Sequence, residues 1–105
     1  MGERSVRVDI RSDVLRRVLV GRMGEFPGLS ADDCSAPDVV LSTTADCTPD
    51  DCAKLVESGA EVVILAIVPS REQRLAYEST GTRYVPMSGN SAELSELFST
   101  LQPAG

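Results

Sequence analysis

Two short apolar runs dominate the middle of the chain, at residues 39–41 and 62–68. Both are rich in β-branched residues and lack polar alternation, which is typical of strands buried on both faces of a parallel sheet. Between them, Thr48 and Pro49 predict the start of a helix that ends at Gly59, since threonine suits the cap and proline the first helical position. In such sheets ligands bind beyond the carboxyl ends of the strands.

The remaining pattern continues this alternation of strands and helices. Strands are predicted at 5–10, 38–43, 61–68 and 83–87, with a weak strand signal within 29–36, and helices at 12–23, 48–58, 70–79 and 91–101. This order predicts an α/β fold with a doubly wound, mainly parallel sheet of four or five strands and helices on both faces. The strand at 83–87 is expected at an edge, because Pro86 cannot donate to a ladder.

The chain has 105 residues and a net charge of −6, which fits one domain with its own core. Residues 1–101 are expected to form the domain and 102–105 a tail or the start of a linker. The acidic balance argues against direct nucleic-acid binding and against membrane association. Cys34, Cys47 and Cys52 match no zinc spacing, and no signal peptide is evident, so we expect a reduced, cytoplasmic protein. The lack of histidine removes the commonest general base.

Three segments, at 38–41, 61–66 and 81–86, followed by an amphipathic closing helix, resemble the receiver domain of response regulators. The segment from Phe26 to Leu29 resembles receivers joined to LuxR-type DNA-binding domains. One departure is large. Between Leu29 and Asp38 there is no room for both the second strand and the second helix of that family, so we expect the second helix to be missing.

The resemblance also implies where a phosphorylation pocket would lie. Receivers transfer a phosphoryl group to an aspartate, with Mg²⁺ held by carboxylates and with a hydroxyl and a lysine on the phosphoryl oxygens. Matching strand ends puts Ser12 and Asp13 at the family's acidic pair and Thr43 at its acceptor position. It puts Ala66 at the position of the hydroxyl residue and Met87 near that of the lysine. At most one carboxylate survives, so the resemblance predicts neither tight Mg²⁺ binding nor phosphate acceptance.

By this resemblance the chain is a non-enzymatic pseudo-receiver, a regulatory module without a cofactor that acts through protein contacts. We expect a homodimer or a regulatory protein partner, within a transcriptional regulator whose DNA-binding domain would lie beyond Gly105. The contact surface is expected on the last half of the chain, at 71–79, 83–87 and 91–101. The aromatic anchors available to it are Tyr77, Tyr84 and Phe98, although Phe98 at helical spacing is more typical of a core residue.

Two other functions remain open. A phosphorylatable receiver would need Asp46 as acceptor, three residues beyond Thr43, but no register also recovers the lysine. A small-molecule sensor would use the vacated pocket for an apolar or amphiphilic ligand. A phosphorylatable receiver should gain a phosphoryl group from a small phosphodonor. A sensor should instead be thermally stabilised by a specific compound.

Further candidate sites are weaker. Five acids have a loose spacing for a hard cation: Asp32, Asp33, Asp46, Asp50 and Asp51. The last two already suit a helix N-terminus. Cys47 and Cys52 form a weak redox or soft-metal pair, for which buried thiols are the simpler interpretation. Hydroxyls at 42–44 are usually satisfied locally rather than phosphorylated by kinases, and no glycine-rich phosphate loop follows the first strand.

Overall fold

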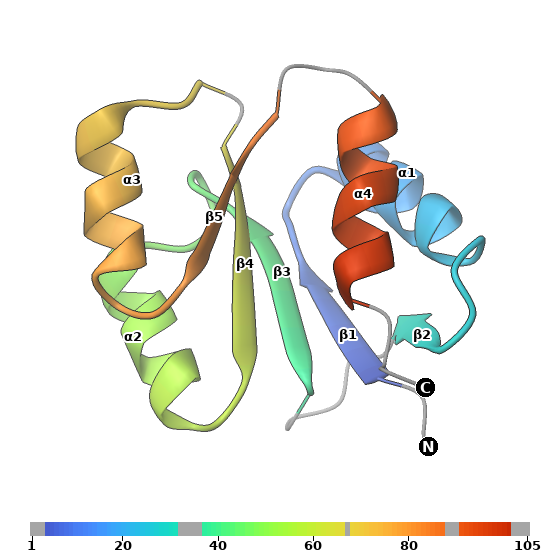
Figure 1. The fold of residues 1–105 in the computed structure, drawn as a ribbon, viewed down its shortest axis with the longest axis horizontal. Helices are drawn as coiled ribbons and strands as arrows, with labels where there is room; N and C mark the ends of the chain where they lie inside the picture. The colour runs from blue at the N-terminus through green and yellow to red at the C-terminus, as the bar shows by residue number, and fades with distance from the viewer. Residues whose placement is uncertain (1–3, 32–36, 67, 88–90, 102–105) are drawn as a thin grey trace.

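The computed structural model describes residues 4–31, 37–66, 68–87 and 91–101, and it contains a parallel sheet between two layers of helices (Figure 1). The strands are β1 (Arg4–Asp9), β2 (Leu29–Ala31), β3 (Val39–Thr43), β4 (Glu61–Ala66) and β5 (Arg83–Pro86). Their order in space is β2-β1-β3-β4-β5, and all four pairings are parallel. The predicted doubly wound α/β fold is therefore confirmed, with β5 at an edge of the sheet.

Four helices cover the sheet: α1 (Asp13–Met23), α2 (Pro49–Glu57), α3 (Arg71–Glu78) and α4 (Ser91–Leu101). The first three begin at the predicted caps, where Ser12, Thr48 and Ser70 each accept a hydrogen bond from a backbone N–H in the first turn. None of the helices in the described part of the chain is long and apolar enough to cross a membrane.

The second helix expected for a receiver is missing between β2 and β3 in the part of the connection that the structure describes. The sheet register explains how the chain manages without it. Ala31 at the end of β2 and Val39 at the start of β3 both pair with Val6 of β1. The end of β2 and the start of β3 therefore lie at the same level of the sheet, on opposite sides of β1. Asp38 then fixes the entry to β3, since its carboxylate accepts the Ser5 N–H at 2.9 Å and its own N–H donates to the Ser5 hydroxyl.

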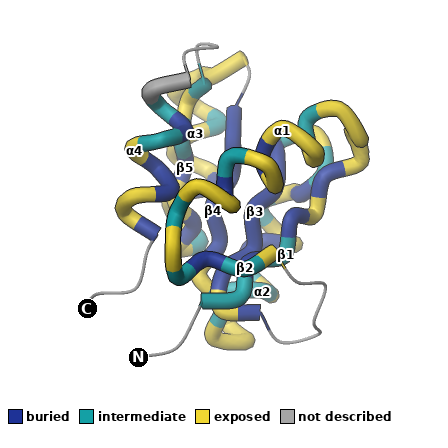
Figure 2. The backbone as a smooth tube through the Cα atoms, turned by 90° about the vertical axis from the view of Figure 1, so that its right-hand side faces the viewer, coloured by how far each residue is buried: buried dark blue, intermediate teal, exposed yellow. Residues whose placement is uncertain are grey.

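The buried side chains form one core on each face of the sheet. The first lies under α1 and α4 and includes Leu41 and Phe98, and the second lies under α2 and α3 and includes Val40 and Tyr77. Every residue of β3 is buried, as the unbroken apolar pattern predicted, and β3 and β4 are dark blue in the interior in Figure 2. The run in β4 stops at Ala66, however. Val68, predicted to continue it, is 81% exposed.

Strand β1 differs from β3 because its two faces have different surroundings. Val6 and Val8 are buried in the core under α1 and α4. On the opposite face Arg7 is half-buried and Asp9 is exposed. Figure 1 shows α2 and α3 on the β4 and β5 side of that face, and α2 packs on β4 and α3 on β5. The missing helix therefore accounts for the polar alternation in β1.

Candidate functional site

The strand order changes direction between β1 and β3, because the chain continues from β1 to β2 on one side and places β3 on the other. Ligands of open α/β sheets bind beyond the carboxyl ends of the strands at this point. The residues that follow the two strand ends here are Ile10–Ser12 and Thr44–Asp46. This edge is therefore the candidate site, and it coincides with the pocket that the receiver resemblance implies.

Thr43 and Asp46 are bound to each other at this edge. Thr43 is 4% exposed, and its hydroxyl donates to a carboxylate oxygen of Asp46 at 2.7 Å. The backbone carbonyl of Thr43 accepts the N–H groups of Asp46 and Cys47, which closes the turn after β3. The Arg11 Nε lies 4.0 Å from the second carboxylate oxygen of Asp46, but the Arg11 side chain is 93% exposed, so this ion pair is weak. The Asp46 carboxylate, 11% exposed, thus has one oxygen engaged by the Thr43 hydroxyl and little contact with water.

The other implied pocket residues have local structural roles. Ser12 caps α1 by accepting the Leu15 N–H, and Asp13 is exposed in the first turn of α1, where a negative charge favours the helix. Ala66 is fully buried, and its carbonyl accepts the Met87 N–H at 2.8 Å. Met87 is partly buried against the core under α1 and α4. Ala66 and Met87 supply neither a hydroxyl nor a cation for a phosphoryl group.

The candidate cation ligands do not gather within the described residues, where no three His, Cys, Asp or Glu side chains could hold one ion. Asp50 and Asp51 stand in the first turn of α2, where Asp51 accepts the Thr48 N–H and completes a capping box. Asp32 and Asp33 lie outside the described residues.

Cys47 and Cys52, which the sequence indicated only weakly as a pair, are in direct contact. Their sulfur atoms lie 3.2 Å apart, and both side chains are buried. Cys47 precedes the Thr48 cap and Cys52 is the fourth residue of α2, which are the two positions that pack together in a hydrophobic staple. Cysteines flanking a capping box at this spacing were therefore the sequence signal for the contact. Burial, together with the hydrogen bond to Cys52, raises the pKa of the Cys47 thiol from 9.0 to about 12.

The three aromatic residues expected as surface anchors lie inside the protein. Phe98 is fully buried, and Tyr77 and Tyr84 are 3% and 6% exposed. The Tyr77 hydroxyl donates to the Cys47 carbonyl, and the Tyr84 hydroxyl donates to Gln73 and accepts the Ser70 N–H. Burial of Tyr77 and Tyr84 argues against both rings as exposed anchors, and Phe98 is a core residue, as its helical spacing also allowed. Burial also raises the pKa of Tyr77.

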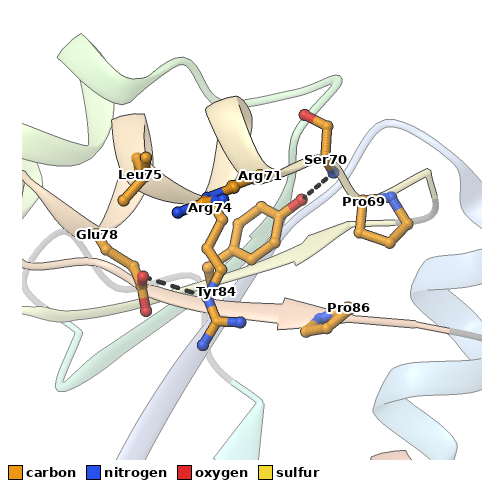
Figure 3. Close-up of a pocket in the computed structure, with 8 residues that line it drawn as sticks. All are labelled: Pro69, Ser70, Arg71, Arg74, Leu75, Glu78, Tyr84 and Pro86. Carbon is orange, nitrogen blue, oxygen red and sulfur yellow. Dashed lines mark hydrogen bonds and ion pairs between the residues drawn. The ribbon is translucent and has the colours of Figure 1, made fainter.

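A groove of about 550 Å³ does lie on the predicted half of the chain, between α3 and β5 (Figure 3). Leu75, which is 60% exposed, and Pro86 give it an apolar part. Arg74 and Glu78 form an ion pair along it at 3.2 Å. Tyr84 lines the groove from β5. This surface therefore combines apolar and charged groups. Of the three rings, Tyr84 lines it, and Tyr77 and Phe98 do not.

Comparison with solved structures shows that this fold is that of receiver domains. The chain is similar to the receiver domain of ChxR from Chlamydia trachomatis, with a TM-score of 0.70 and 15% identity over 95% of this chain and 96% of that one. It is also similar to the response regulator ChrA of a heme-sensing two-component system, with a TM-score of 0.67 and 17% identity over 91% of this chain. It spans 55% of ChrA.

A third similar structure comes from a different setting. A protein described as pilus assembly-related, from Burkholderia pseudomallei, matches with a TM-score of 0.72 and 14% identity over 99% of this chain and 94% of that one. No protein-family model matches the sequence, and no curated protein matches it either. At these identities the similarity establishes the fold of the chain and does not extend to its chemistry.

Proposed function

We propose that this chain is a pseudo-receiver, a regulatory domain that acts through protein contacts without phosphorylation. The carrying observation is the hydrogen bond from the Thr43 hydroxyl to the Asp46 carboxylate. A neutral, buried hydroxyl stands where the resemblance would put the receiver acceptor, and the nearest carboxylate is already engaged by it. A phosphoryl acceptor needs a free carboxylate that a metal ion and an incoming phosphodonor can both approach.

The residues at this edge also fit Mg²⁺ poorly. That ion requires oxygen ligands in near-ideal octahedral geometry and usually one or two carboxylates. Here Ser12 caps a helix and Asp13 points its charge at the same helix terminus. The guanidinium of Arg11 lies on the outer side of Asp46, where its positive charge opposes a cation. The proposal therefore needs no metal and no cofactor.

The contact surface that we propose is the groove between α3 and β5. Exposed apolar side chains on a soluble domain mark contact sites when they gather beside polar groups. Leu75 lines this groove, and Val68 is exposed close to it in the sequence, just before Pro69 of the groove wall. As an edge strand, β5 pairs only with β4 in the sheet. A second copy of the chain could pair the same surface with itself, as a two-fold interface requires.

We further propose that the domain serves a longer transcriptional regulator. The support is that the chain spans only 55% of ChrA and 45% of a protein described as a two-component response regulator/GGDEF domain protein. In both of them a receiver-like fold occupies part of a longer chain. The net charge of −6 argues that contact with nucleic acid would fall to another domain.

Sedimentation velocity over a concentration series tests the surface. Leu75→Ser should weaken self-association about thirtyfold or more, because burying each leucine contributes roughly 1–2 kcal/mol and a two-fold interface loses two of them. Val14→Ser is the matched control, since Val14 is 76% exposed on α1, which packs on the opposite face of the sheet. Equal weakening by both substitutions would contradict the assignment to α3 and β5. A wild-type chain that stays monomeric at all concentrations would refute self-association.

A further inference from the structure

The two buried thiols at the start of α2 are placed for a reaction with each other. The Cys47 and Cys52 sulfurs share a hydrogen bond at 3.2 Å, and a disulfide needs them about 2.05 Å apart. The contact is set by the staple around the Thr48 capping box, so both residues are held together whenever α2 is capped. An alkyl side chain would serve the staple equally well. A pair of cysteines adds the capacity for redox chemistry.

We propose that Cys47 and Cys52 are a site of reversible oxidation, at which a small peroxide converts the two thiols into one intramolecular disulfide. The sulfur of one thiolate attacks a peroxide oxygen and the O–O bond breaks. This gives a sulfenic acid and a hydroxide that takes up the released proton as water. The second sulfur then attacks the sulfenic sulfur, the S–S bond forms and the S–O bond breaks, and a second water leaves. Two electrons pass from the sulfurs to the peroxide.

The burial of the pair selects the oxidant and sets the rate. Cys47 is 5% exposed and Cys52 is fully buried, so a small peroxide reaches them more readily than a bulky disulfide. Burial and the neighbouring thiol raise the pKa of Cys47 to about 12, which keeps the reactive thiolate scarce at neutral pH. Oxidation should therefore be slow at pH 7 and accelerate roughly tenfold per pH unit as the thiolate fraction grows.

A hydrogen bond and a ring contact, in sequence, join this pair to the surface assigned above. The Cys47 carbonyl accepts the Tyr77 hydroxyl, and the Tyr77 ring stacks on Tyr84 with centroids 6.0 Å apart. Tyr84 in turn lines the groove between α3 and β5. Drawing the sulfurs together moves the backbone at Cys47 or Cys52, and that movement acts on Tyr77. Oxidation is therefore expected to alter the groove, an effect that rests on the proposed function whereas the disulfide itself does not.

Intact mass after peroxide treatment tests the disulfide. The Cys34→Ser protein keeps only the proposed pair and should lose two hydrogen masses with hydrogen peroxide at pH 8. After denaturation it should resist alkylation, and dithiothreitol should restore two alkylation sites. Adding Cys47→Ser or Cys52→Ser should abolish the loss of two hydrogens. Disulfide formation only in urea-unfolded protein, or oxidation to sulfinic acid without a disulfide, would overturn the proposal.

Tyrosine emission tests the link to the groove, because the chain has no tryptophan and only two tyrosines. In the Cys34→Ser protein the emission should change on oxidation and return on reduction. Tyr84→Phe should keep this response and Tyr77→Phe should lose it. A disulfide that forms without any change in emission would refute the link and leave the modification site standing. Neither readout depends on self-association, so failure here is distinct from failure of the contact surface.

Discussion

Replacing Thr43 with aspartate restores the residue type of a receiver acceptor and tests whether the site is now organised around a neutral side chain. In the wild type the Thr43 hydroxyl donates to Asp46 at 2.7 Å. An aspartate cannot donate when ionised, and it places a second carboxylate against the first. Asparagine has the same shape and keeps a donor, so Thr43→Asn is the matched control.

The cost follows from the geometry. Two carboxylates about 4 Å apart repel by roughly 4 kcal/mol at an effective dielectric constant near 20. The lost hydrogen bond to a charged acceptor adds about 1.5–3 kcal/mol. Asp46 is only 11% exposed, so water screens the pair little. We therefore expect Thr43→Asp to lower the free energy of unfolding by about 5–7 kcal/mol near pH 8, and Thr43→Asn by much less.

Urea unfolding at two pH values provides the assay. At pH 4.5 the two carboxylates of the aspartate variant can share a proton, as closely placed acids do, and the repulsion disappears. Stability lost at pH 8 should then largely return at pH 4.5, bringing the two variants to within about 1 kcal/mol of each other. If aspartate and asparagine are equally stable at pH 8, or if their difference is independent of pH, the account of this site is wrong.

Two further predictions concern the fold. Gly21→Ala should raise the free energy of unfolding by about 0.5–1 kcal/mol in urea, because a Cβ there meets no atom within 4 Å and alanine favours the interior of α1. Gly81→Ala should instead lower the free energy of unfolding by about 1–2 kcal/mol, since Gly81 has a φ of +88° and an added Cβ would lie 3.3 Å from Val56. Equal changes in stability for the two glycine variants would contradict this. The raised pKa of Cys47 stabilises the fold fully below pH 9, and this contribution should be lost as the pH rises towards 12. Between pH 8 and 11, the free energy of unfolding measured in urea should decline less steeply for Cys47→Ser than for the wild type. Parallel curves for the two proteins would refute this role of Cys47.

The arrangement of strands and helices could be predicted because its signals are local. Ser12, Thr48 and Ser70 act at the helix termini where their side chains can reach the first-turn N–H groups. The unbroken apolar run of β3 reflects helices on both sides of that strand. The missing helix could be predicted from chain length alone, since Leu29 and Asp38 are too close in sequence to enclose a strand and a helix.

The site could be predicted only in part because it depends on contacts between elements. The end of β3 at Thr43 could be predicted, but the bond from Thr43 to Asp46 depends on how the turn after β3 closes. The exposure of Tyr77 and Tyr84 depends on which side of α3 packs against the sheet, and the few apolar residues of that short helix did not define the side. The large apolar residue of α3 that remains exposed is Leu75.

The central claim is that a receiver fold is kept here without its phosphorylation chemistry, and intact mass spectrometry tests it most directly. The wild-type chain would be incubated with a small phosphodonor and Mg²⁺, beside an active receiver as a positive control. We predict no gain of a phosphoryl group under conditions that modify the control fully. Stoichiometric phosphorylation that is lost in Asp46→Asn or Asp13→Asn would contradict the account.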